Sequence, residues 1–263
     1  MANRILVAHD LSRDSDVALR RAVALAKQTG ARLDLLHVLD ESTGSDKAQQ
    51  VRGDLQVRLD MIGSESQLWL RKGDVVEELL TQATGLQADL LVVGRYRSQR
   101  QHGFAGTTLE RILHACSMPL LLAVTPTAPY KCALAALDFS RCASRALQSA
   151  WGLLPATAAL TALHIHEVAE IHGSDNAEQA LQQELFDHLI AELRGGLSDT
   201  GARLLSNVRH GERNNCLDAA LAELQPDLLA LGGHSRGEIS SALLGSLTRK
   251  YLDQAPCDVL IAH

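Results

Sequence analysis

A segment near the carboxyl terminus has the composition of a phosphate-binding loop. Gly232 ends an apolar run, Gly233-His234-Ser235 follows it, and Gly245-Ser246 begins 13 residues after Gly232, at the expected start of a helix. Gly232 would let the chain turn without a Cβ atom, and the N–H groups of Gly245 and Ser246 would attract an anion at the helix amino terminus. An ordinary strand-to-helix loop with a serine cap explains the same residues, so both interpretations stay open.

The same segment also fits the G-x-S-x-G nucleophile elbow of α/β-hydrolases, at residues 233–237. That fold needs further strands after the serine to carry the acid and the histidine, but only 28 residues follow Ser235. A Ser-His-Asp triad is therefore not expected. The chain has no Gly-Lys pair, which excludes a Walker A loop. With no general base or metal cluster visible, any nucleotide hydrolysis should be slow, and we expect at most a slow ATPase.

Histidines are the other candidates for chemistry, because the chain has 11 of them. His164 and His166 end an apolar run two residues apart, so both rings would face one side of a strand, near Glu167. Such a group could hold a transition metal. His37 occupies the matching place in the first half of the chain, which favours a structural role for His164. We predict no metal site here.

Four short blocks of the first half recur in the same order in the second half, which shows an internal repeat. The paired blocks are residues 5–13 and 133–141, 35–38 and 162–165, 89–94 and 227–232, and 106–107 and 245–246. A proline-containing stretch at 125–129 lies between the copies and is typical of a linker. The sequence therefore predicts two related domains, 1–126 and 131–263. The first 126 residues carry 15 basic and 15 acidic residues, so the net charge of −6 lies in the second copy.

Short apolar runs alternate with amphipathic stretches in both copies, which predicts an α/β fold. Strands are expected near 3–9, 32–39, 66–71, 89–94 and 119–124, and again near 131–137, 158–165, 203–208, 227–232 and 258–262. Helices are expected near 13–29, 46–61, 74–85 and 107–116, and near 140–153, 176–198, 213–224 and 244–254. Each copy should thus be a doubly wound domain with a five-stranded parallel sheet flanked by four helices. Ligands of such sheets bind at the carboxyl ends of the strands.

Composition excludes several classes of protein. Of the 263 residues, 46% are hydrophobic, yet no apolar run approaches the roughly 18 residues of a membrane span, so no membrane partner is expected. Only 3% are aromatic, which leaves few stacking platforms for nucleic acid. The amino terminus opens directly into a strand-like run, and the five cysteines include no C-x-x-C pair. These features predict a cytoplasmic protein.

The ordered motifs of both copies resemble the universal stress protein family. Asp10 and Asp138 end the first strands, His37-Val38 and His164-Ile165 end the second strands, and the glycine segment is close to the G-x2-G-x9-G-[ST] of nucleotide-binding members. The resemblance covers nearly the whole chain. It implies an adenine nucleotide α-hydrolase-like fold and a stress-response sensor or regulator that binds ATP or another adenine nucleotide, with which Mg²⁺ could enter.

The resemblance also implies where the nucleotide would be bound. In the family the first aspartate contacts the nucleotide, the backbone after the second strand flanks adenine, and the glycine loop holds ribose and phosphates. In the second copy these positions are Asp138, Ile165, Gly232, Ser235, Gly245 and Ser246; in the first they are Asp10, Val38, Gly94, Gly106 and Thr107. Ser235 stands where the family has a glycine, and the first copy has a basic loop with Arg95, Arg97 and Arg100. The second copy is therefore the expected nucleotide site.

Two further expectations follow from the resemblance. Single-domain members pair through their last strands, so the two copies are expected to form such a pair within one chain, and a homodimer of chains is also conceivable.

The alternatives to nucleotide binding are a stress-associated scaffold without nucleotide, and a protein that binds a small molecule or metal in the same clefts.

Overall fold

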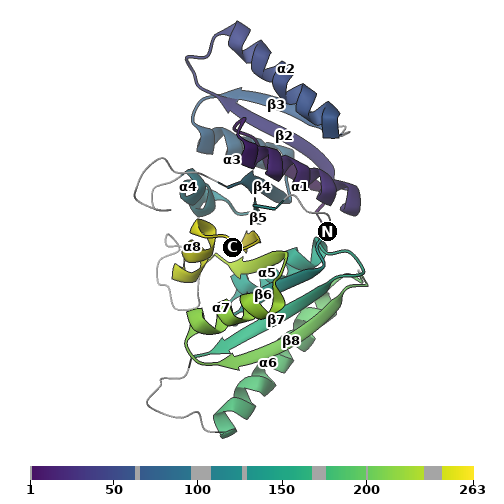
Figure 1. Ribbon diagram of the computed structural model, residues 1–263, viewed down its shortest axis with the longest axis vertical. Helices are drawn as coiled ribbons and strands as arrows, with labels where there is room; N and C mark the ends of the chain where they lie inside the picture. The colour runs from purple at the N-terminus through teal and green to yellow at the C-terminus, as the bar shows by residue number, and fades with distance from the viewer. Residues whose placement is uncertain are drawn as a thin grey trace. The chain divides into compact units, whose positions relative to one another are not determined.

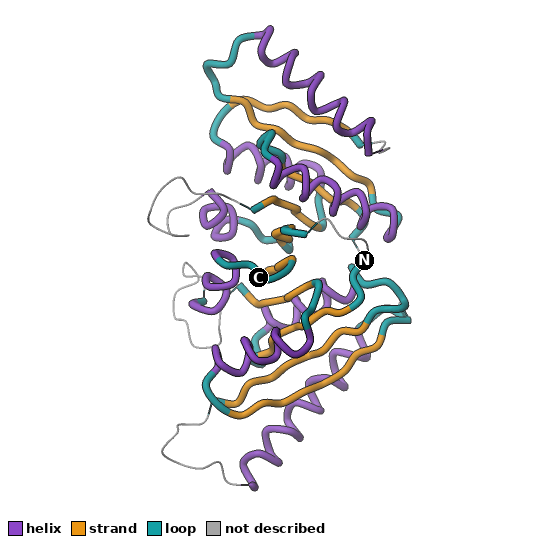
Figure 2. Tube along the Cα trace, in the orientation of Figure 1, coloured by secondary structure: helices purple, strands orange, loops and turns teal. Residues whose placement is uncertain are grey.

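A computed structural model describes residues 2–62, 66–95, 108–125, 129–167, 176–199, 201–233 and 245–263 (Figure 1). The chain forms two compact units, Ala2–Ala128 and Pro129–His263, which we call the N-terminal unit and the C-terminal unit. In each unit strands and helices alternate along the chain (Figure 2). Among the helices that the structure describes, none combines the length and apolar character that a membrane span requires.

The described residues of the N-terminal unit form a five-stranded parallel sheet with four helices. Its elements are β1 (Arg4–Ala8), α1 (Arg13–Thr29), β2 (Arg32–Leu39), α2 (Ser45–Ile62), β3 (Gln67–Lys72), α3 (Val75–Leu86), β4 (Leu90–Gly94), α4 (Thr108–Ala115) and β5 (Leu120–Ala123). The strand order is β3-β2-β1-β4-β5, and every pair in it is parallel. β1 and β4 are buried almost throughout, as expected for strands covered on both faces.

The C-terminal unit repeats this arrangement. Its elements are β6 (Cys132–Leu137), α5 (Arg141–Gly152), β7 (Ala159–His166), α6 (Asn176–Gly196), β8 (Arg203–His210), α7 (Arg213–Leu224), β9 (Leu228–Gly232), α8 (Ser246–Asp253) and β10 (Asp258–Ala262). The order β8-β7-β6-β9-β10 is the same as in the N-terminal unit when the strands are taken in sequence. The predicted fold class, two tandem doubly wound α/β domains, is confirmed.

The first helix of each unit begins at the same capping signal. Ser12 accepts a hydrogen bond from Ser15 N–H at the start of α1, and Ser140 accepts one from Ala143 N–H at the start of α5. α1 ends at Gly30, whose φ of 74° is the left-handed conformation that glycine adopts without strain. The helix expected near 13–29 is confirmed.

Strand order fixes where a ligand can bind. In each sheet the chain first adds strands in one direction and then returns to add them on the other side of the first strand, so that successive right-handed crossovers cover opposite faces. The direction reverses beside β1 in the N-terminal unit and beside β6 in the C-terminal unit. A crevice forms at that point, outside the carboxyl ends of the strands.

Candidate functional site

A pocket of about 1170 Å³ lies at the carboxyl ends of β6, β7 and β9, and we call it the C-terminal pocket. Residues 136–139, 163–167, 231–232 and 245–248 line it, together with side chains of α6 and the start of α7. The volume is sufficient for a small organic ligand or cofactor. Five predicted site residues line this one pocket: Asp138, Ile165, Gly232, Gly245 and Ser246. Ser235 lies outside the described residues.

Asp138 is held at the pocket by a tight turn. Its Oδ1 accepts a hydrogen bond from Ser140 N–H at 3.0 Å, and the Ser140 hydroxyl in turn caps α5. Phe139, between them, has a φ of 62°, which is uncommon for a bulky residue. The turn therefore fixes the carboxylate and places the Phe139 ring in the pocket wall.

His164 is part of the packing below the pocket. Its Nδ1 lies 2.9 Å from the Leu137 carbonyl, which can only accept, so Nδ1 carries the proton. The ring meets Phe139 edge to face at 4.6 Å between centroids and stacks on Phe186 at 5.5 Å. Burial lowers the pKa of His164. His37 makes the same bond to the His9 carbonyl at 2.6 Å, so this histidine is structural in both units.

Ile165 stands where the sheet opens into the pocket. The last register pair of β6 and β7 joins Leu137 to His164, and β7 continues for two more residues. The edge of β7 that faces β6 therefore loses its neighbouring strand at Ile165. A planar ligand edge could approach the backbone there. Val38 follows His37 in the N-terminal unit in the same way, since β1 ends opposite Leu36.

Gly232 is required by packing, which differs from the predicted role in a turn. A Cβ atom there would lie 2.8 Å from Ala143 N, in the first turn of α5. The space at Gly94 in the N-terminal unit is smaller still, since a Cβ there would lie 2.5 Å from Asp14 O. Neither glycine has a positive φ. These two glycines thus allow the first helix to approach the fourth strand.

Gly245 and Ser246 form the start of α8. Gly245 is the N-cap residue and makes no side-chain cap, and Thr248 Oγ1 donates to the Gly232 carbonyl at 3.0 Å. The first N–H groups of a helix have no intrahelical partner, so those of α8 are directed toward the pocket end of the unit. Among the described residues, a Cβ at Gly245 would meet only Thr248 Oγ1, at 3.8 Å. The described part of the unit therefore leaves room for a side chain at this glycine.

Charged groups are few in the pocket wall. Arg213, at the start of α7, donates to Glu167 Oε2 at 2.6 Å, and both side chains are about half exposed. The guanidinium could instead reach an anionic ligand. In the described part of the chain, no group of three or more His, Cys, Asp or Glu side chains is placed to hold a metal ion.

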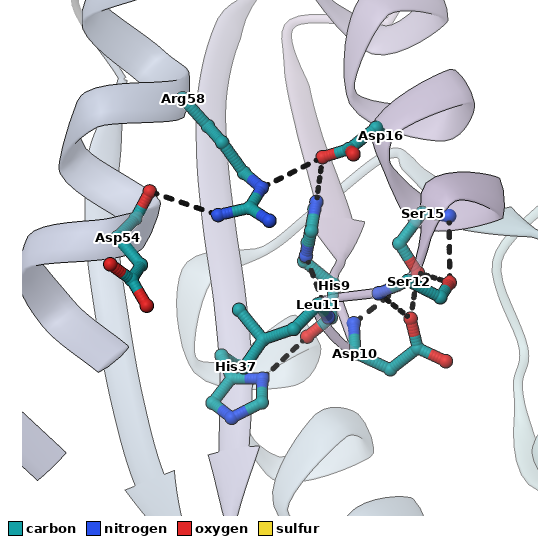
Figure 3. A network of polar contacts seen from close by, with 9 residues as sticks. All are labelled: His9, Asp10, Leu11, Ser12, Ser15, Asp16, His37, Asp54 and Arg58. Atoms are coloured by element: carbon teal, nitrogen blue, oxygen red, sulfur yellow. Dashed lines mark hydrogen bonds and ion pairs between the residues drawn. The ribbon is translucent and has the colours of Figure 1, made fainter. Parts of the chain in front are cut away.

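Near the end of β1 in the N-terminal unit, polar side chains contact one another in a network (Figure 3). His9 is fully buried, with Nδ1 accepting from Leu11 N–H at 3.0 Å, so the proton of the neutral ring is on Nε2. Nε2 donates to Asp16 Oδ1 at 3.1 Å, and Arg58 of α2 donates to the same oxygen at 2.9 Å. Burial lowers the pKa of His9 despite the opposing effect of Asp16.

Asp10 is also engaged within the N-terminal unit. It accepts from Ser12 N–H at 2.9 Å and from the Ser15 hydroxyl. Burial alone would raise the pKa of Asp10. The hydrogen bonds from Ser12 and Ser15 have the larger effect, so the pKa lies below its ordinary value. Gly106, Thr107, Arg97 and Arg100 lie outside the described residues.

Some residues of these sites were not predicted. Phe139 and Arg213 line the C-terminal pocket, and Asp16 and Arg58 surround His9. The repeat could have indicated Phe139, because it and Leu11 follow the paired aspartates. The contact of Arg58 with Asp16 spans 42 residues, and nothing in the local sequence indicates it.

Comparisons with known proteins agree with this fold. The model of the universal stress protein family matches residues 1–123 and again residues 129–263. Curated proteins give no significant match. The structure of a universal stress protein from Archaeoglobus fulgidus DSM 4304 is similar, with 19% identity, a TM-score of 0.74 and coverage of 99% of this chain and 98% of that chain. A protein of unknown function from Pseudomonas aeruginosa PAO1 has 20% identity, a TM-score of 0.69 and coverage of 99% and 92%.

At these identities the solved structures establish a shared fold. The two family matches together span nearly the whole sequence and fall one on each half. The chain therefore belongs to the universal stress protein family, as a tandem of two such domains.

Proposed function

We propose that the C-terminal pocket binds an adenine nucleotide, ATP among them, and that the chain acts as a nucleotide-dependent sensor or regulator. The observation that supports this most is the convergence of Asp138, Ile165, Gly232, Gly245 and Ser246 on one pocket. They come from three strand ends and one helix start, and each is a position that family resemblance associates with nucleotide.

The pocket offers a suitable group for each part of the nucleotide. The base would lie between the Phe139 ring and the free edge of β7 at Ile165, where apolar walls and backbone groups are both present. The Asp138 carboxylate would accept from the ribose hydroxyls. The phosphates would lie at the amino terminus of α8, where the dipole and the N–H groups favour negative charge, and Arg213 would add a cation.

Such a site would hold the nucleotide more readily than hydrolyse it. Mg²⁺ would enter on the phosphates, because the described residues supply no carboxylate cluster for it. His164, the most buried histidine of the pocket wall, already uses Nδ1 on the Leu137 carbonyl. We expect turnover to be slow.

The proposal is tested by native mass spectrometry and calorimetry with ATP, using Gly245→Val. Wild-type protein should bind one nucleotide per chain. The substituted side chain should block the phosphates and abolish binding, while the described residues around Gly245 leave space for it. Gly44→Val is the matched control, because Gly44 accepts the first hydrogen bond of α2 as Gly245 does for α8, and a Cβ there meets nothing within 4 Å.

Two outcomes would contradict the proposal. Absence of binding at millimolar ATP would favour a scaffold without nucleotide. Unchanged affinity in Gly245→Val would place the phosphates elsewhere. Asp138→Ala and Asp10→Ala then show which unit binds the nucleotide, since only Asp138→Ala should weaken ATP binding.

A further inference from the structure

His166 and His210 are brought together by the sheet although they are 44 residues apart in the sequence. They are directly paired in the parallel register of β7 and β8, and each is the last residue of its strand. Side chains of a register pair stand on the same face of the sheet. The two rings lie edge to face, with 5.6 Å between their centroids.

The Nδ1 atoms of these two histidines are shielded from solvent. Within the described residues, neither Nδ1 has a hydrogen-bond partner. A buried polar atom without a partner costs free energy, so native structures usually supply a protein group, a water molecule or an ion. Both nitrogens belong to directly paired residues at one end of the sheet, so one bound group could satisfy the two together.

Glu178 of α6 orients the first of these rings. Its Oε1 lies 3.4 Å from His166 Nε2, and a carboxylate this close favours the tautomer with the proton on Nε2. The lone pair of His166 is then on Nδ1, the shielded atom. A carboxylate behind a histidine in this way is the usual outer partner of a metal-binding imidazole, because it fixes the ring and raises its basicity.

We propose that His166 and His210 bind a divalent transition metal ion of the Co²⁺, Ni²⁺, Cu²⁺ or Zn²⁺ class through their Nδ1 atoms. Imidazole suits these ions. With metal–nitrogen bonds of about 2.0–2.1 Å, two imidazoles on one tetrahedral ion have centroids about 5 Å apart, so the rings need to close only slightly. Water or an exogenous ligand completes the coordination, and His166 lines the C-terminal pocket, which provides the entry path.

The site is tested on untagged, nucleotide-free full-length protein with Co²⁺ as the probe, followed by its visible absorption and by calorimetry. Wild-type protein should bind one Co²⁺ per chain, displaceable by Zn²⁺. His166→Gln and His210→Gln should each weaken binding by more than about tenfold, since each removes one of two protein ligands. His188→Gln, an exposed histidine of the same pocket, should leave the affinity unchanged.

A variant with both ligands intact guards against a folding defect. Glu178→Gln should weaken Co²⁺ binding by about tenfold, at the lower end of the effect of losing an outer carboxylate. In wild-type protein, Zn²⁺ should shift the Nδ1 nitrogen resonances of His166 and His210 but leave those of His164. If wild-type protein binds no metal, or the two histidine variants bind it as wild type does, the proposal is wrong and water occupies the position. Because no nucleotide is used, this result is independent of the ATP experiment.

Discussion

In both units an aspartate follows the first strand, and a residue with positive φ follows the aspartate. Leu11 has a φ of 68° and Phe139 a φ of 62°, and the aspartate before each accepts a hydrogen bond from the serine after it. A histidine near the end of the second strand donates to a backbone carbonyl at the end of the first strand or just after it, His37 to His9 and His164 to Leu137. The backbone around the strand ends is therefore a property of the fold.

The side chains on this shared backbone differ. His9, Ser15 and Asp16 correspond, at an offset of 128 residues, to Leu137, Ala143 and Ser144. In the N-terminal unit His9 and Arg58 both donate to Asp16, and the Ser15 hydroxyl donates to Asp10. In the C-terminal unit the counterparts cannot do so, and Asp138 faces a pocket. In the proposed function Asp138 is therefore available to the nucleotide, whereas Asp10 accepts a hydrogen bond from a side chain of its own unit.

The largest effects are expected from the glycines that bring helix and strand together in each unit. Gly94→Ala should destabilise the N-terminal unit by about 3 kcal/mol and Gly232→Ala the C-terminal unit by about 2 kcal/mol, because the added Cβ overlaps backbone more closely at Gly94. Gly245→Ala should cost less than about 1 kcal/mol, since space is available at this N-cap. Urea unfolding measures the three losses.

Each unit has its own fluorescent reporter for this measurement. Trp69 is in β3 and Trp151 in α5, so Trp151→Phe and Trp69→Phe backgrounds follow one unit at a time. Equal losses at Gly245 and Gly232 would mean that the close approach to α5 does not explain Gly232.

Element order was predictable because it depends on local patterns repeated twice. α1 spans Arg13–Thr29, as expected from the amphipathic stretch near 13–29. Strand ends marked by Asp138, Ile165 and Gly232 converge because parallel strands place their carboxyl ends together.

The features that could not be predicted depend on contacts between segments that are distant in the sequence. Arg58 meets Asp16 only when α2 packs near α1, and His166 meets His210 only once the register of β7 and β8 is known. Gly232 was predicted for the wrong reason, because its close neighbour lies about 90 residues earlier in the chain and leaves no local signal.

The buried His9 should make the N-terminal unit sensitive to acid. Unfolded chains protonate this histidine near the ordinary pKa of about 6.5, whereas the folded unit resists protonation to lower pH because burial lowers the pKa of His9. Below about pH 6.5 the unfolded state thus binds more protons than the folded state. The free energy of unfolding therefore decreases as the pH is lowered, by at most about 1.4 kcal/mol per pH unit.

His9→Leu places in the N-terminal unit the residue type that Leu137 provides in the C-terminal unit. Urea unfolding between about pH 5 and 7, followed through Trp69, should show a shallower pH dependence in this variant. His164 is present in both proteins and cancels from the comparison. Parallel curves for variant and wild type would show that His9 titrates normally in the folded unit.

Ala143→Ser should convert the second site toward the first. The introduced hydroxyl can donate to Asp138 as Ser15 does to Asp10, and the small side chain fits a position that is only 2% exposed. Competition for the carboxylate should weaken nucleotide binding by about tenfold, the value of one good hydrogen bond. Calorimetry with ATP measures the change, with Ala146→Ser, one helical turn later and equally buried, as the control. Equal affinity in both variants would argue against a role for Asp138 in the nucleotide site.

The smallest effect is expected at the mouth of the C-terminal pocket, where Glu167 holds Arg213 at 2.6 Å. Because both side chains are about half exposed, their ion pair is worth at most about 1 kcal/mol. Glu167→Gln removes the competing carboxylate and one negative charge, which releases the guanidinium for the phosphates, so ATP affinity should rise about threefold. Arg213→Gln should lower it by a similar factor, and the gain from Glu167→Gln should shrink as salt is raised. A gain that persists in the double variant would show that Glu167 acts on the nucleotide directly, and Arg213 would then contribute nothing to the difference between the two units.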